Sequence, residues 1–153
     1  AILLTSFMKT CNCKPGNDYI GIGAGVLLLN EEESKVLLLL RSKNCKNEPN
    51  TWSRPGGTIE YGETIEECLC RETREEIGVE ITDLEFMHIM DHLVPEKKQH
   101  WIAIGYKGKI VQGQKPYIVE PHKCDDLRWF SKDELPKDIY GPTRPAIELW
   151  LAE

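Results

Sequence analysis

Three glutamates lie close together in the stretch "CRETREEIGV", at positions 72, 75 and 76. Residues 64–77 contain neither Gly nor Pro, so this part of the chain is predicted to be a helix. A helix advances about 100° per residue, which places Glu72, Glu75 and Glu76 on one face of it. Carboxylates at these spacings repel one another unless cations lie among them.

Two kinds of cation could neutralise this face. Arg71 and Arg74 lie on the same predicted helix, so one explanation is a solvated surface held together by ion pairs. The other explanation is a site for Mg²⁺ or Mn²⁺, because these hard ions prefer oxygen ligands.

The predicted helix has start and stop signals. Thr64, with Glu67 three residues later, forms a capping-box pattern, and Gly78 provides the stop. Leu69 and Ile77 fall on a face next to the glutamates, so we expect that face to be buried against a sheet.

Short apolar runs bounded by turn formers predict strands on both sides of this helix. The run "GIGAGV" is similar to the start of a dinucleotide-binding fingerprint. It lacks the third spaced glycine and continues into strand residues, which argues against a Rossmann fold. The predicted elements are strands at 19–30, 35–41, 84–94, 100–110 and 127–130, loops at 42–57 and 119–126, and a closing helix at 143–153.

These elements indicate the α/β class, of the α+β sandwich type, with a mixed sheet flanked by helices. A chain of 153 residues without repeats or long linkers fits one domain, which we place at residues 19–153. Residues 1–18 are expected to be an N-terminal extension. Its first seven residues fit either a tag remnant or an extra edge strand.

Composition narrows the class of protein. The formal net charge of -6 argues against a nucleic-acid partner, since phosphate backbones are held by excess Lys and Arg. No apolar run approaches the roughly 18 to 20 residues of a bilayer span, so no membrane partner is expected. Six irregularly spaced cysteines predict no disulfide framework and favour a cytoplasmic protein, with Cys11 and Cys13 as free thiols.

His88 and His92 should lie on the same face of a strand, with the hydrogen bonds of their rings satisfied.

The residues upstream of the glutamates favour the metal site. "GGTIEYGETIEECLCRETREEIGV" follows the spacing G-x5-E-x7-R-E-U-x-E-E-x-G-U, where U is a bulky apolar residue, with one departure at Thr73. This pattern resembles the Nudix box of the MutT-like Nudix hydrolases. "TWSRPGG" and "EPHKCDDLRWFSKDELP" are similar to the flanking pattern of the nucleoside-triphosphate branch, so the resemblance runs from about Tyr19 to the C-terminus. The matching positions are Gly57, Glu63, Arg71, Glu72, Glu75, Glu76, Gly78 and Val79.

The resemblance implies roles for the helical residues. Glu72, Glu75 and Glu76 would bind Mg²⁺ or Mn²⁺, and Glu72 or Glu75 would also orient or deprotonate the attacking water. Arg71 would hold a glutamate through a charge-assisted contact.

Residues outside the helix complete the implied site. Gly57 would offer its backbone carbonyl to the metal, and Glu63 would steady the junction between loop and helix. Glu120 would supply a further ligand or base, with a solvated loop carboxylate as the alternative.

The resemblance also implies a reaction, namely attack by water at a phosphorus of a small nucleotide polyphosphate, in an enzyme of this family that is often a homodimer. Our first interpretation is a Mg²⁺-dependent pyrophosphohydrolase that converts nucleoside or deoxynucleoside triphosphates to a monophosphate and pyrophosphate. Pro95, 16 residues after Val79, matches a marker of ADP-ribose pyrophosphatases, so ADP-ribose or a nucleotide sugar is the alternative substrate. A second alternative is a non-catalytic nucleotide-binding module.

Overall fold

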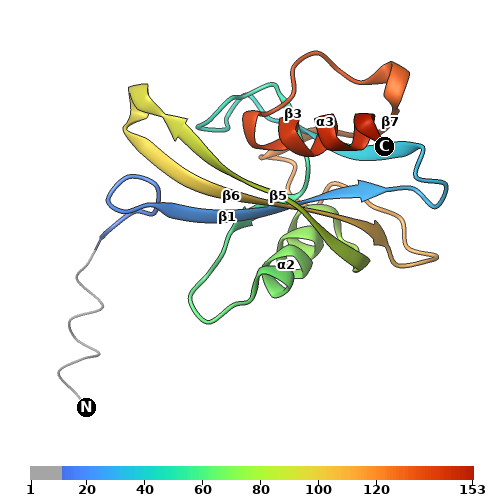
Figure 1. The fold of residues 1–153 in the computed structure, drawn as a ribbon, viewed down its shortest axis with the longest axis horizontal. Coiled ribbons are helices and arrows are strands. Elements are labelled where there is room, and N and C mark those ends of the chain that lie inside the picture. The colour runs from blue at the N-terminus through green and yellow to red at the C-terminus, as the bar shows by residue number, and fades with distance from the viewer. Residues whose placement is uncertain (1–11) are drawn as a thin grey trace.

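The computed structural model of the chain describes residues 12–153. Its centre is a mixed sheet with strand order β3-β2-β1-β6-β5, in which β4 pairs with β1 and β7 pairs with β2. Helices α2 and α3 pack on opposite faces of this sheet (Figure 1), which confirms the predicted fold class. The elements are β1 (Gly21–Leu29), β2 (Lys35–Arg41), β3 (Trp52–Ser53), β4 (Gly56–Thr58), α2 (Ile65–Ile77), β5 (Ile81–Val94), η1 (Pro95–Lys97), β6 (Gln99–Ile110), β7 (Cys124–Ser131), η2 (Lys132–Glu134), η3 (Gly141–Thr143) and α3 (Arg144–Ala152).

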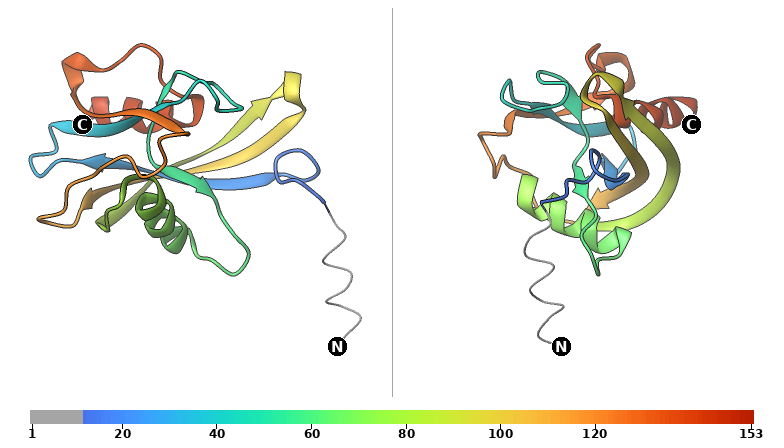
Figure 2. Two further views of the ribbon diagram at one scale, coloured as in Figure 1. Left: turned by 180° about the vertical axis from the view of Figure 1, so that it is seen from behind. Right: turned by 90° about the vertical axis from the view of Figure 1, so that its left-hand side faces the viewer.

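The central strand β1 has neighbours of both directions. It runs parallel to β6 along its whole length and antiparallel to β2 and β4. Strands β5 and β6 form a long antiparallel hairpin. Figure 2 shows that this hairpin is curved and that its turn extends away from the two helices. The short β4 pairs directly with β1 and leads into the loop before α2.

From Ala24 to Leu29, strand β1 is buried on both faces. Val26 and Leu28 pack in the cluster that includes α2, whereas Leu27 and Leu29 pack in the cluster that includes α3. A strand covered on both sides reads as a continuous apolar run rather than an alternating one. This burial explains the sequence "VLLL" and fixes β1 as the platform on which α2 is placed.

Helix α2 begins and ends as predicted. Thr64 accepts a hydrogen bond from the Glu67 backbone N–H, and the Glu67 side chain accepts one from the Thr64 backbone N–H. Gly78 ends the helix with a φ of 68°, a left-handed conformation that favours glycine. Thr73, the departure from the box pattern, is fully buried and donates its hydroxyl to the Leu69 carbonyl, so its polar atom is satisfied inside the core.

Three segments differ from the prediction. The segment 42–57, predicted as loop only, contains β3 and the start of β4, because both pair with neighbouring strands despite their turn-rich sequence. The strand predicted at 127–130 extends over Cys124–Ser131, since β2 pairs with nearly all of it. The strand predicted at 84–94 begins at Ile81, and register shifts accommodate the extra residues.

The cysteines depart from the expectation at one position. Cys45, Cys68, Cys70 and Cys124 are free thiols, as expected for a chain without a disulfide framework. Cys13 is disulfide-bonded, so the prediction of a free thiol there is wrong. Cys11 and the rest of residues 1–11 lie outside the described part of the chain. None of the helices in residues 12–153 has the length and apolar character that a bilayer crossing requires.

Candidate metal centre and substrate cavities

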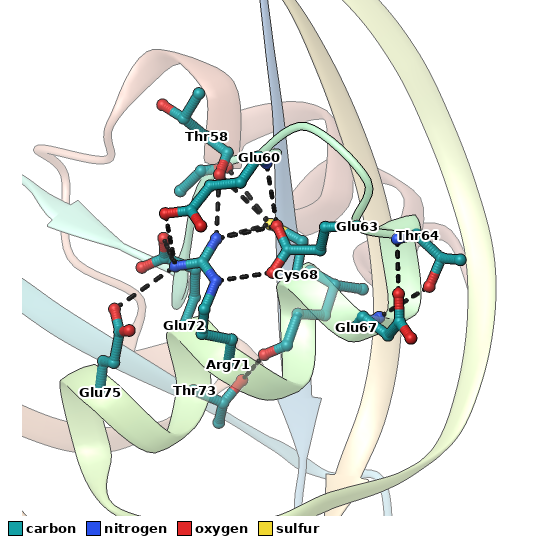
Figure 3. A network of polar contacts seen from close by, with 12 residues as sticks. Thr58, Glu60, Glu63, Thr64, Glu67, Cys68, Arg71, Glu72, Thr73 and Glu75 are labelled. Atoms are coloured by element: carbon teal, nitrogen blue, oxygen red, sulfur yellow. Dashed lines mark hydrogen bonds and ion pairs between the residues drawn. The ribbon is translucent and has the colours of Figure 1, made fainter. Parts of the chain in front are cut away.

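Arg71 is the centre of a polar network in the middle of α2 (Figure 3). Its Nε and Nη2 atoms donate to the two carboxylate oxygens of Glu63, at 2.6 and 3.0 Å. Its Nη1 atom donates to Glu72 Oε1 at 2.8 Å and lies 3.4 Å from Glu75 Oε2. Nη2 also donates to the Thr58 carbonyl at 3.1 Å. One guanidinium therefore brings together three of the predicted carboxylates and the end of β4.

The pKa values of two carboxylates in the network shift in opposite directions. The hydrogen bonds from Arg71 lower the pKa of Glu63 to about 2, so Glu63 is a constantly charged anchor for the guanidinium. Burial raises the pKa of Glu72, although the contact with Arg71 opposes this change. A cation bound beside Glu72 would stabilise the charged form of its carboxylate.

Two glycines bring the loop backbone close to the glutamates. The Gly56 N–H donates to Glu76 Oε2 at 3.2 Å. A Cβ atom at Gly57 would overlap the Glu72 carboxylate, so only glycine allows this approach. The Gly57 carbonyl oxygen lies 3.8 Å from the Cys68 thiol of α2. Residues 56 and 57 thus bring the loop backbone next to Glu72 and Glu76.

Among the acidic residues of α2, Glu76 has the most strongly raised pKa. Burial raises the pKa of Glu76 to about 8, and the charges of Glu72 and Glu120 add to this effect. Glu120 forms an ion pair with Lys123 at 2.9 Å. The Val119 N–H donates to the Glu76 carbonyl at 3.1 Å, which holds the Glu120 loop against the end of α2. The structure therefore places Glu120, predicted from a loop far along the chain, on the same side as Glu76.

These groups form an oxygen-rich region but not a complete metal-coordination site. Within residues 12–153, no three acidic, histidine or cysteine side chains converge on one point as metal ligands. Arg71 holds one oxygen of Glu72, and the Gly56 N–H holds one oxygen of Glu76. The available donors are carboxylates, with the Gly57 carbonyl on the adjoining loop. Burial and the charges of Glu72 and Glu120 together raise the pKa of Glu76, and a bound cation would relieve this repulsion. This donor set fits a hard divalent ion.

Two cavities meet at Glu76. The first, which we call the loop cavity, has a volume of about 510 Å³ and lies between the end of β2 and the loop at residues 120–124. The second, the sheet cavity, has a volume of about 230 Å³ and lies over β1 and β6 near Gly23 and Ala103. The residues that line both cavities are Arg41, Asn47, Ser53 and Glu76.

Two arginines of these cavities were not identified from the sequence. Arg41 donates through Nε and Nη2 to the Asn47 carbonyl, at 3.2 and 2.8 Å, and lies 4.2 Å above the Tyr140 ring. Arg54 is buried, and its Nη1 lies 3.0 Å from His88 Nε2. Neither forms an ion pair with a carboxylate of residues 12–153. Their only signal in the sequence was a positive charge beside an apolar strand or a glycine pair.

The histidines of β5 are not satisfied as predicted. Since arginine can only donate, His88 Nε2 must accept from Arg54, and burial lowers the pKa of His88 to about 4, so its ring is neutral. His88 Nδ1 and His92 Nε2 are buried and have no hydrogen-bond partner among the described residues. The expectation is therefore wrong for one nitrogen of each ring, and His92 also lines the sheet cavity.

The family of the chain follows from a direct comparison. A family model described as NUDIX domain matches residues 20–150, which is most of the chain. The chain belongs to the Nudix family. A MutT NUDIX hydrolase from Burkholderia pseudomallei has a similar solved structure, with a TM-score of 0.76 and 29% sequence identity over 84% of this chain and 95% of that chain.

Curated relatives point to the same Nudix family. A NAD-capped RNA hydrolase NudC from Pseudomonas aeruginosa is 29% identical over 138 residues, or 89% of this chain and 46% of that protein. A protein of the same name from Stutzerimonas stutzeri is 30% identical over 115 residues, or 75% of this chain and 38% of that protein. This chain thus spans less than half the length of these two relatives.

Membership in the Nudix family indicates a hydrolase that acts on phosphorus-containing acid anhydrides, and Nudix hydrolases generally use divalent metal ions. The names of the two curated relatives include an RNA substrate, so they do not support the expectation that nucleic acid plays no part. The expected homodimer stays a prediction.

Proposed function

We propose that this Nudix chain is a Mg²⁺-dependent pyrophosphohydrolase of nucleotide substrates, with nucleoside or deoxynucleoside triphosphates as its first substrate class and Mn²⁺ as a possible replacement ion. The observation that carries the proposal is the position of Glu76, which belongs to the acidic face of α2 and also lines both cavities. A polyphosphate that spans the two cavities would pass directly over this face.

The proposed metal ligands are Glu72, Glu75, Glu76 and the Gly57 carbonyl, with Glu120 as an additional ligand or base. A divalent cation bound there would neutralise phosphate charge and act as a Lewis acid on a phosphoryl oxygen. Without such a cation, the acidic face would repel a polyphosphate.

The other side chains of the proposed site would position the ligands and activate the attacking water. Arg71 holds Glu72 and Glu75 in place, and Glu63 fixes the plane of the Arg71 guanidinium. Glu72 or Glu75 would orient the attacking water and accept its proton. Attack at one phosphorus of a triphosphate breaks the anhydride bond and releases a nucleoside monophosphate and pyrophosphate.

A second candidate substrate carries a bulky group on each side of the pyrophosphate, such as ADP-ribose, a nucleotide sugar or a dinucleotide. The observation that favours it is the loop cavity, which also adjoins Glu76 and exceeds the sheet cavity in volume. The names of the curated relatives, NAD-capped RNA hydrolase, agree with such a two-sided substrate.

The test is a substrate panel with Mg²⁺ in which products are identified by chromatography. The panel contains triphosphates, ADP-ribose, nucleotide sugars, dinucleotides and NAD-capped RNA. Pyrophosphate released from a triphosphate supports the first candidate, whereas two monophosphates from a dinucleotide, or AMP and ribose 5-phosphate from ADP-ribose, support the second. Tight nucleotide binding without any product would instead indicate the non-catalytic module.

The variant Glu76→Gln checks the metal assignment. It removes the charge at nearly constant volume, so turnover should almost vanish while the fold is kept. Glu66→Gln is the matched control, because Glu66 is an exposed residue in the first turn of the same helix. Full activity in Glu76→Gln would rule out the proposed ligand role of Glu76.

A further inference from the structure

The sequence "GIGAGV", which does not match a Rossmann fingerprint, supplies residues 23–25 to the floor of the sheet cavity. Gly23 and Gly25 of β1 stand beside Ala103 and Gly105 of β6 in the parallel register. They point to the same face as Leu27, the face that α3 covers. A Cβ atom at Gly23 would meet only the Gly57 backbone, its carbonyl oxygen at 3.3 Å. The small residues leave flat backbone where side chains would normally fill the space.

The two ends of this floor are closed by large side chains. At one end the Trp101 ring covers Gly21, and a Cβ atom there would overlap it. At the other end Arg54 covers Gly25, and a Cβ atom there would overlap Arg54 Nε. Tyr140 and Pro142 also line the cavity. A flat slot bounded by aromatic and apolar groups suits a heterocyclic ring.

Arg54, at the end of this floor, is unusual because it is a buried cation without an anionic partner among the described residues. Its side chain makes one hydrogen bond among the described residues, to the neutral His88 ring at 3.0 Å, and the residue is only 7% exposed. Burial lowers the pKa of Arg54 to about 10. A buried charge without a counter-charge is costly, so such a group is retained most readily where a ligand completes its hydrogen bonds.

We propose that the sheet cavity holds the base of the nucleotide substrate and that Arg54 donates hydrogen bonds to a ring carbonyl, so the site prefers oxo-bearing bases to amino-bearing ones. This inference rests on the proposed function, because it assigns a ring to a nucleotide whose phosphates lie at Glu76. The arginine fork matches the oxygen and nitrogen acceptors at the edge of an oxopurine. An amino group in the same position would place two donors face to face.

Two pairs of substrates differ at the decisive group and at the hydrogen on the ring nitrogen next to it. Inosine and adenosine triphosphates carry a 6-oxo and a 6-amino group, and uridine and cytidine triphosphates carry a 4-oxo and a 4-amino group. We expect kcat/KM to be about tenfold or more higher for the oxo member of each pair in the unmodified protein. In Arg54→Met, which removes the donors, this ratio should fall towards one. Arg54→Lys keeps the charge without the fork and should give an intermediate ratio.

Arg128→Met is the matched control, since Arg128 lies on β7 with an exposed side chain that pairs with Asp126. It should keep the full oxo-to-amino ratio. Equal rates for both members of each pair in the unmodified protein would overturn the proposal. A uniform loss in Arg54→Met for all four substrates would also overturn it, because it would make Arg54 a phosphate contact.

Calorimetric binding of inosine and adenosine monophosphates without divalent metal separates this proposal from the proposed function, because it needs no hydrolysis. Tighter binding of the inosine nucleotide to the unmodified protein supports the base assignment even if no triphosphate is cleaved. Equal binding of the two nucleotides, or binding of neither, contradicts it. This measurement also decides the question if Arg54→Met fails to fold.

Discussion

Arg71 and Glu63 are joined by two parallel hydrogen bonds, of 2.6 and 3.0 Å, between a guanidinium fork and a carboxylate. Because Glu63 lies in the loop before α2 and Arg71 lies in the middle of the helix, the pair locks the loop to the helix. The same guanidinium then reaches Glu72. The position of a proposed metal ligand is therefore set by a residue that need not touch the metal.

Replacing Arg71 by lysine should test this dependence. Lysine keeps the charge but cannot form the fork, so Glu72 should lose its fixed position. We expect activity and metal affinity to fall about 10- to 100-fold, the usual effect of removing a residue that orients a metal ligand. Steady-state kinetics and Mn²⁺ titration measure both. Arg74→Lys is the control, because Arg74 pairs with Glu80 on the exposed side of the helix. Equal losses in the two variants would argue against a special role for Arg71.

Gly57→Ala should damage the site without removing a charged group. The added Cβ would overlap the Glu72 carboxylate, so either the carboxylate or β4 must move. We expect kcat to fall about 10-fold or more, since the proposed ligands depend on this approach. Gly113→Asn is a suitable comparison, because the space around Gly113 is open and asparagine tolerates its positive φ of 86°. Normal kinetics in Gly57→Ala would show that the close approach is not needed.

The contribution of Glu76 to the stability of the metal-free protein should fall as the pH rises from about 4.5 to about 8. The pKa of Glu76 is raised to about 8, so the folded protein keeps a proton there that the unfolded chain releases. A raised carboxyl pKa stabilises the fold at low pH, and this contribution is lost as pH rises through the folded value, by up to about 1.4 kcal/mol per pH unit.

Urea denaturation in a metal chelator, at several pH values, measures this loss. Glu76→Gln does not titrate, so the difference in unfolding free energy between the two proteins should change with pH in the stated direction. Added Mg²⁺ should oppose the loss in the unmodified protein. A pH-independent difference would show that Glu76 titrates normally.

Thr64→Ala should weaken the fold with little direct effect on the chemistry. It removes the side-chain acceptor of the capping box, which costs about 1 kcal/mol. The midpoint of chemical denaturation measures this change, and Thr64→Ser, which keeps the hydroxyl, should restore most of it. At a temperature where both variants are folded, kcat should remain within a few-fold of the original. A large loss of kcat there would show that the cap also positions the glutamates.

The sequence predicted the parts of the structure that depend on local signals. The cap at Thr64, the stop at Gly78 and the apolar runs of β1 and β2 are such signals, and each gave the correct element. The box pattern also led to a set of carboxylates that the fold brings into one network.

The parts that sequence did not predict depend on pairing between distant segments. The short β4 exists because β1 offers it hydrogen-bonding partners, not because "GGT" favours strand. Arg54 is buried because glycines on two other strands leave room for its side chain and that of His88. Neither fact has a local signature, so the sheet cavity could not be recognised before the register of β1 against β6 was known.

The burial of one face of α2 connects the proposed metal site to the packing of the core. Cys68, Leu69, Thr73 and Ile77 rest on the sheet that also carries β4, so the thickness of that packed layer sets the gap between the glutamates and the Gly57 carbonyl. Interiors are close-packed and transmit small volume changes. A methyl group gained or lost in this layer should therefore change the coordination geometry of the proposed metal site. We expect these core positions to vary little among related sequences, because both folding and catalysis would depend on them.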